Sequence, residues 1–167
     1  MAARLPAGLP YGTAIRLARI DDLPALCLLG AAINAIHHEA WPTVFAAPAD
    51  PERDCAFWQP FVTTTDAAAF IAEEGAVAVG MVTVSVATES SSLLKPLRYG
   101  RIGSVGVTAA MRNRGIGRAL IGHAESWARS HGAAEVRLNV WAFNDRAIEL
   151  YRELGYDLRS VHLGRTL

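Results

Sequence analysis

Hydrophobic and polar positions along this chain follow two periods, and the changes of period outline its elements. Short runs rich in valine and other apolar residues, several with alternating polar positions, are typical of strands. Five such runs occupy residues 13–17, 67–73, 76–87, 98–108 and 135–141, and the closing residues 156–167 predict one or two more strands. The second and third runs flank a turn at Glu74-Gly75. The pattern therefore predicts six or seven strands.

Helical spacing dominates elsewhere. Residues 115–130 carry apolar side chains at i, i+3/i+4 and i+7, and Gly132 follows as a stop. Asp21-Asp22-Leu23-Pro24 predicts the start of an earlier helix, with an aspartate as its N-cap. Asn144 or Asp145 caps a last helix that ends before Gly155. Residues 34–66 predict one or two short helices with loops, so about four helices are expected.

Length and composition favour one folded domain. The chain has 167 residues, of which 51% are hydrophobic and 19% charged, so it can bury a core. Residues 1–12 hold two prolines and two glycines and predict a loose tail, which leaves 13–167 as the domain. Formal net charge is zero, whereas a nucleic-acid-binding protein normally has a basic excess. We therefore expect no nucleic-acid partner.

Cysteine usage and the N-terminus suggest no special compartment. Cys27 and Cys55 lack metal-ligand spacing and a histidine cluster, so we expect neither a zinc site nor a disulfide framework. No signal-peptide pattern begins the chain, and no uninterrupted apolar stretch predicts a membrane helix. These features together predict a cytoplasmic protein with no membrane partner.

The segment Arg112-Asn113-Arg114-Gly115-Ile116-Gly117-Arg118 joins a predicted strand to a predicted helix. The first N–H groups of a helix lack internal partners, and the helix dipole adds positive potential there. Glycine lets a phosphate approach closely, and arginine supplies forked donors. The spacing matches neither a Walker loop nor a dinucleotide fingerprint. An anion site is indicated, although an exposed turn would also accommodate these residues.

Two motifs in order resemble the GNAT superfamily of N-acetyltransferases. Arg112-x-x-Gly115-x-Gly117 is similar to the family's R/Q-x-x-G-x-G/A signature, and Val105-Gly106-Val107 ends the preceding strand as its fourth strand often does. The segment from Asn144 through Tyr151 to Gly155-Tyr156 is similar to the N-x-x-A-x-x-x-Y-x-x-x-G-F/Y pattern. The resemblance is strongest over residues 100–157 and does not cover 34–66.

This resemblance implies an α/β (α+β) fold with a mixed, mostly antiparallel sheet, and acetyl-CoA as acyl donor without a metal. It further implies that a primary amine of a small molecule or peptide attacks the thioester directly. Tyr151 would be the general acid, and Ser104 could order a water. The residues expected to bind acetyl-CoA are Val105, Gly106, Val107, Arg112, Asn113, Arg114, Gly115, Ile116, Gly117, Arg118, Asn144 and Tyr151.

The base, the acceptor amine and the oligomeric state stay open at this level, and a homodimer is allowed. The strand before the loop lacks the Glu or His that many relatives carry there. Candidates elsewhere are His37, His38, Glu39, Glu73 and Glu74. Two other functions also stay open: a CoA-binding sensor or regulator without turnover, motivated by the missing base, and an unrelated nucleotide-binding α/β protein.

Overall fold

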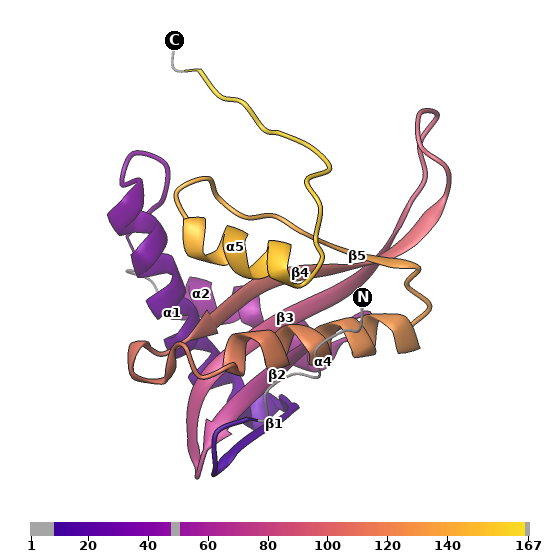
Figure 1. Ribbon diagram of the computed structural model, residues 1–167. Helices are drawn as coiled ribbons and strands as arrows, with labels where there is room; N and C mark the ends of the chain where they lie inside the picture. Colours follow the sequence, from indigo (N-terminus) through magenta and orange to yellow (C-terminus); the bar gives the residue numbers. More distant parts are fainter. Residues whose placement is uncertain (1–8, 48–50, 166–167) are drawn as a thin grey trace.

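A computed structural model describes residues 9–47 and 51–165 and contains one five-stranded sheet (Figure 1). Its strands are β1 Thr13–Leu17, β2 Ala67–Glu74, β3 Val77–Glu89, β4 Leu97–Val107 and β5 Glu135–Leu138, in spatial order β1-β2-β3-β4-β5. The first four pair antiparallel in succession, and β5 pairs parallel with β4. The sheet is therefore mixed and mostly antiparallel, as the resemblance implies.

Helices cover both faces of the sheet. They are α1 Leu23–Ala40, α2 Pro51–Trp58, α3 Pro60–Thr63, α4 Ile116–Ser130 and α5 Asp145–Glu153, with short 3-10 turns at Ile20–Asp22 and Ala109–Met111. In Figure 1, α4 crosses in front of the sheet, and α1 and α2 lie behind it. The helices predicted at 115–130 and from Asn144/Asp145 both form. The first helix continues to Ala40 and so includes His37, His38 and Glu39.

Alternation along β2 explains the two-sided core. Ala68, Phe70 and Ala72 are buried in the cluster that contains α4, while Ala69 and Ile71 are buried in the cluster that contains α1 and Trp58. Successive side chains of a strand point to opposite faces, so a strand covered on both sides is apolar almost throughout. The unbroken apolar run in β2 is the sequence signature of that position.

The sheet has fewer strands than predicted. Within the described part of the chain, residues 156–165 form no strand, and β5 ends at Leu138 instead of Trp141. The count is five, in place of six or seven. A strand exists only where a partner offers matching backbone groups, and an apolar pattern cannot supply that partner.

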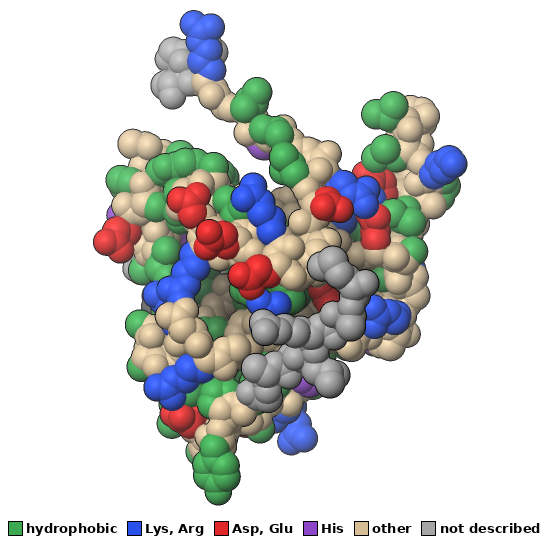
Figure 2. Space-filling view, viewed as in Figure 1, with side chains coloured by type: hydrophobic (Ala, Val, Ile, Leu, Met, Phe, Trp, Pro, Cys, Tyr) green, Lys and Arg blue, Asp and Glu red, His purple; other side chains and the backbone are tan. Residues whose placement is uncertain are grey.

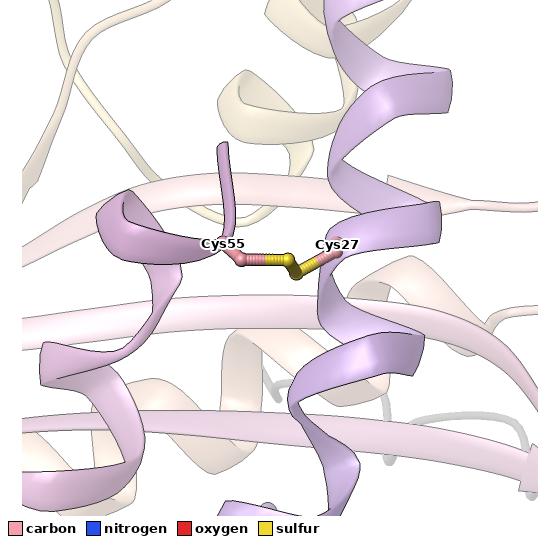
Figure 3. The surroundings of a disulfide bond; sticks show 2 residues. All are labelled: Cys27 and Cys55. Carbon is pink, nitrogen blue, oxygen red and sulfur yellow. A yellow bond between two sulfur atoms is a disulfide. The ribbon is translucent and has the colours of Figure 1, made fainter. Parts of the chain in front are cut away.

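The two cysteines are bonded to each other, which contradicts the expectation that the chain has no disulfide. Cys27 of α1 and Cys55 of α2 are joined with a Cα–Cα distance of 5.4 Å (Figure 3). They are 28 residues apart and belong to no spacing motif, so only the docking of α2 on α1 reveals the pair. Disulfides persist mainly in oxidising compartments. The cytoplasmic location stays a prediction, without support from the cysteines.

The segment Ile20–Ala40 is long and apolar enough to cross a membrane, with a mean hydropathy of 1.3. This differs from the sequence-based expectation that no segment would qualify. A single helix of this kind is weak evidence for a membrane span, because a buried core helix and a signal sequence near an N-terminus meet the same criteria. Leu26 and Leu29 of this segment are buried against the sheet. These two side chains take part in the core of the domain, whereas Leu28 of the same segment is 75% exposed.

Charges of both signs are interspersed on one face of the molecule. On the face shown in Figure 2, Lys and Arg side chains lie among Asp and Glu, without a broad area of one sign. This distribution accords with the zero net charge of the chain. A polyanion would find no extended basic surface on this face.

Candidate active site

Strands β4 and β5 separate part of the way along β4. They pair from Tyr99 with Glu135 to Ile102 with Leu138, while β4 stays paired with β3 as far as Val107. From Gly103 to Val107, no described strand pairs with the outer edge of β4. Backbone groups along such an edge are free to bind an extended, peptide-like ligand.

A β-bulge begins where the two strands separate. Val82 pairs with Val105 and Val84 with Ile102, so Gly103 and Ser104 together lie opposite Thr83. Thr83 is only 1% exposed, and its Oγ1 accepts a 2.9 Å hydrogen bond from the Ser104 N–H. A Cβ on Gly103 would lie 2.7 Å from that oxygen. The bulge thus depends on a glycine on one strand and a hydroxyl on the other.

Thr83 was missed by sequence reasoning, although two signals pointed to it. It is a polar residue within a buried, mostly apolar run of β3, and a glycine inside a strand often marks a bulge. Which glycine opposes which residue depends on the strand register, and the sequence alone leaves that register open.

A cavity of about 410 Å³ lies beside the bulge, bounded by α1, residues 45–47, β4, residues 139–141 and α5. Its lining brings together four of the predicted residues, Ser104, Val105, Asn144 and Tyr151, from two elements. Gly106, Val107 and the segment 112–118 do not line it. Gly106 and Val107 form the end of β4, and the segment 112–118 lies in the loop before α4 and in the first turn of that helix.

Tyr151 is a half-buried residue of α5. Burial raises the pKa of its phenol above the ordinary value, so the hydroxyl keeps its proton at neutral pH. The hydroxyl has no hydrogen-bond partner among the described residues. The neighbouring Tyr156, whose ring centre is 5.8 Å away, donates its hydroxyl to Glu125 at 2.7 Å. Of these two phenols, Tyr151 is therefore the one available to a ligand in the cavity.

Asn144 combines two tasks. It is the N-cap of α5, where its Oδ1 accepts a 3.2 Å hydrogen bond from the Ala147 N–H. That bond orients the side chain and leaves its amide NH₂ as a donor in the cavity lining.

The predicted anion loop has the backbone of a helix start preceded by two left-handed residues. Asn113 and Gly115 have φ angles of 63° and 81°, and α4 begins directly afterwards at Ile116. Within the described chain, no backbone or side-chain oxygen accepts from the N–H groups of residues 113–118. Consecutive unpaired amides next to left-handed residues are typical of anion-binding loops.

The three arginines of the loop differ in their contacts. Arg112 donates from Nε to the Val107 carbonyl at 3.1 Å, and Arg118 forms an exposed ion pair with Glu153 of α5. Arg114 makes no hydrogen bond or ion pair with the described residues. One guanidinium is thus immediately available to an anion, and two are held by contacts that a ligand could replace. The ligand-binding roles of the loop stay predictions.

Of the candidate bases, His37 alone lines the cavity among the described residues. Its Nδ1 lies 2.8 Å from the Ile33 carbonyl oxygen. A carbonyl only accepts, so Nδ1 carries the hydrogen and Nε2 of the neutral ring is an acceptor. His38 bonds instead to the Phe45 carbonyl, and Glu73 pairs with Arg16 near β1. Because adjacent residues of a helix point in different directions, His37 faces the cavity and His38 does not.

Known proteins are similar to this chain in sequence. The profile of the acetyltransferase (GNAT) family matches residues 31–156, which is more than half of the chain. An uncharacterized N-acetyltransferase, YdgE of Bacillus subtilis (strain 168), is 30% identical over 74 residues, or 44% of this chain. The match spans about half (47%) of the length of that relative.

Several solved structures share the fold. A mutant of the BH1408 protein from Bacillus halodurans superposes with a TM-score of 0.82 at 21% identity, covering 92% of this chain and 99% of that one. The aminoglycoside N-acetyltransferase AAC(6')-Iy in complex with CoA gives 0.73 at 19% identity, covering 98% and 99%. The aminoglycoside acetyltransferase meta-AAC0020, from an uncultured soil metagenomic sample and in complex with sisomicin, gives 0.68 at 21%, covering 93% and 97%. The matched family profile, together with this fold, shows that the chain belongs to the acetyltransferase (GNAT) family.

Proposed function

We propose that the protein transfers an acetyl group from acetyl-CoA to a primary amine of a small molecule. The observation that carries the proposal is that the free edge of β4, the cavity and the loop before α4 adjoin one another. The free edge of β4 leads at one end into the cavity with Tyr151 and at the other into the loop with unpaired amides. A ligand with a diphosphate, a peptide-like arm and a reactive end matches that sequence of features.

The amides of residues 113–118 and the guanidinium of Arg114 are the groups suited to the diphosphate. The edge Gly103–Val107 offers backbone donors and acceptors to the arm, as an added strand would require. A ligand that bonds to the Val107 carbonyl competes there with the Arg112 side chain. Arg112, once displaced, would be free to turn towards the phosphates.

The cavity supplies groups for each proton movement. The nitrogen of the amine forms a bond to the thioester carbon, and the bond from that carbon to sulfur breaks. His37 Nε2 takes the proton that the amine loses, and Tyr151 gives its proton to the departing thiolate. A backbone N–H on the free edge of β4 stabilises the negative oxygen. Solvent then carries the proton from His37 back to Tyr151, so the protein regains its initial state.

The test is turnover of acetyl-CoA by the full chain with a panel of primary amines, followed as free thiol. We expect amine-dependent thiol release, with the acetylated amine identified by mass spectrometry. A competition between CoA and ATP for the protein accompanies it, and CoA is expected to win. Preferential binding of ATP would refute the assignment of the loop.

A CoA sensor without turnover is the second candidate, because residues 99–104 of β4 carry no carboxylate or imidazole. The position of His37 in the cavity favours the enzyme, since it supplies the missing acceptor of a proton. Tight CoA binding without turnover of any amine would establish the sensor instead.

The named acetyltransferases of similar fold raise an aminoglycoside as acceptor. Aminoglycosides carry several ammonium groups, and burying these requires carboxylates as partners. No described residue that lines the cavity is an aspartate or glutamate. The electrostatics of this cavity therefore favour an acceptor of lower charge.

A further inference from the structure

We propose that the acceptor amine carries a single aromatic ring, which binds against a cluster of rings that forms part of the cavity wall. This inference rests on the proposed acetyl transfer and names the class of its substrate. The aromatic cluster consists of the rings of His37, Trp41, Phe45, Trp141 and Phe143.

The rings of the aromatic cluster hold each other in place. Phe45 and Trp141 meet edge to face, with ring centres 4.8 Å apart and planes at 83°. Trp41 meets Trp141 at 5.7 Å and Phe143 at 5.3 Å, also edge to face, with planes at 84° and 68°. These distances lie in the preferred range for aromatic pairs. The cluster joins the end of α1 and the residues after it to the segment between β5 and α5, so it forms a firm wall.

Part of this wall faces the cavity. His37, Phe45 and Trp141 line it, and Trp141 keeps 44% of its surface exposed. An exposed aromatic surface beside a cavity favours a ligand that covers it with apolar atoms. A planar ring can add a further edge-to-face contact of the kind already present in the cluster.

The charge of the cavity favours the same class. Its 15 described lining residues include no Asp, Glu, Lys or Arg. The reacting nitrogen loses one proton to solvent before it attacks, since it must be neutral, and gives a second proton to His37 as the bond to carbon forms, so it needs no carboxylate. Every additional ammonium group would lose its hydration without gaining a partner. A polyamine or aminoglycoside is therefore disfavoured, and an amine with one nitrogen is accommodated.

The size of the cavity is compatible with this class. Its volume is about 410 Å³, and it is partly open to solvent. The acetyl group and the end of the thioester take part of this space. The remainder matches one ring with a short alkylamine arm.

The experiment uses the full chain with acetyl-CoA and compares four amines by free-thiol release: 2-phenylethylamine, 2-cyclohexylethylamine, spermidine and kanamycin. We expect kcat/KM for 2-phenylethylamine to exceed that for both polycations by at least about tenfold, since these lack partners. The excess over the cyclohexyl amine, which matches it in size, is expected to be about fivefold from ring–ring contact. Equal values for the two ring amines, or a preference for either polycation, would overturn the inference and leave acetyl transfer standing.

A variant of Trp141 tests whether the aromatic cluster causes the preference for the aromatic amine. Trp141→Leu should raise KM for 2-phenylethylamine about tenfold, while kcat and the KM for acetyl-CoA change little. Phe57→Leu is the matched control, because Phe57 is a 60% exposed aromatic residue of α2 outside the cavity lining. Phe45→Leu replaces Trp141→Leu if the latter does not fold. An unchanged KM in the cavity variant would refute the site. Absence of turnover with all four amines and with the wider amine panel, despite CoA binding, would instead refute the proposed function itself.

Discussion

Replacement of Thr83 by valine tests how the bulge of β4 is built. Valine keeps the shape of threonine and removes the hydroxyl, whose oxygen accepts from the Ser104 N–H at 2.9 Å. Thr83 is 1% exposed, so no water replaces the lost acceptor from that side. An unsatisfied buried donor costs about 1–3 kcal/mol. Since Ser104 is half-buried beside the cavity, we expect about 1–2 kcal/mol of lost unfolding free energy.

The same change should affect the reaction. Without the hydroxyl, the backbone at Gly103 and Ser104 can move relative to β3, and this backbone begins the free edge of β4. A misplacement of about 1 Å can reduce a rate on the order of 100-fold, so a tenfold loss in kcat/KM for acetyl-CoA is a moderate expectation. Urea unfolding measures the stability, and thiol release measures the activity.

Thr83→Ser is the matched control. It keeps the hydroxyl and removes one methyl group, which costs roughly 0.5–1.5 kcal/mol by analogy with Ile→Val. The serine variant should therefore lose stability but retain kcat/KM. If the valine and serine variants had the same kcat/KM, the hydroxyl would have no part in placing the β4 edge, and the reasoning would be refuted.

Three further predictions concern Tyr151, Gly117 and Asp22. Tyr151→Phe should lower kcat about 100-fold with little change in acetyl-CoA affinity, as expected for loss of a general acid; an unchanged kcat would remove Tyr151 from the mechanism. Gly117→Asp should weaken CoA binding about tenfold through its charge. Steric effects are small, because a Cβ there meets only Leu150 and Val107 at 3.9 Å. Calorimetry with Gly117→Asn as the uncharged control checks this, and normal affinity in the aspartate variant would contradict the loop assignment. Bonds from Arg16 lower the pKa of Asp22 to about 2, so its contribution to stability is complete above the ordinary value of 3.8 and disappears as pH falls towards 2. Asp22→Asn should thus be less stable than wild type by about 1 kcal/mol at pH 7. The two unfolding free energies should converge as pH falls through about 2; a constant difference would argue against the ion pair.

Local sequence patterns by themselves predicted the family and several helices and strands of this protein. The loop from Arg112 to Arg118 and the segment from Asn144 to Gly155 identified the family before any coordinates, because a tight helix start and a capped helix are short-range structures. The predicted helix start near Gly115 and the predicted cap at Asn144 or Asp145 are confirmed, since α4 begins at Ile116 and Asn144 caps α5. The apolar run at 67–73 and the valine-rich run at 76–87 likewise predicted strands, and both form, with residues buried on the two faces of the sheet.

Contacts between distant segments were beyond the reach of these patterns. The bond between Cys27 and Cys55 depends on how α2 docks on α1, and the hydrogen bond from Ser104 to Thr83 depends on strand register. His37 enters the cavity, whereas His38 does not, because of the rotation of α1 about its axis. Each of these outcomes requires two or more elements to be positioned together in space. Periodicity constrains each element separately, and the packing of side chains between elements settles their relative placement.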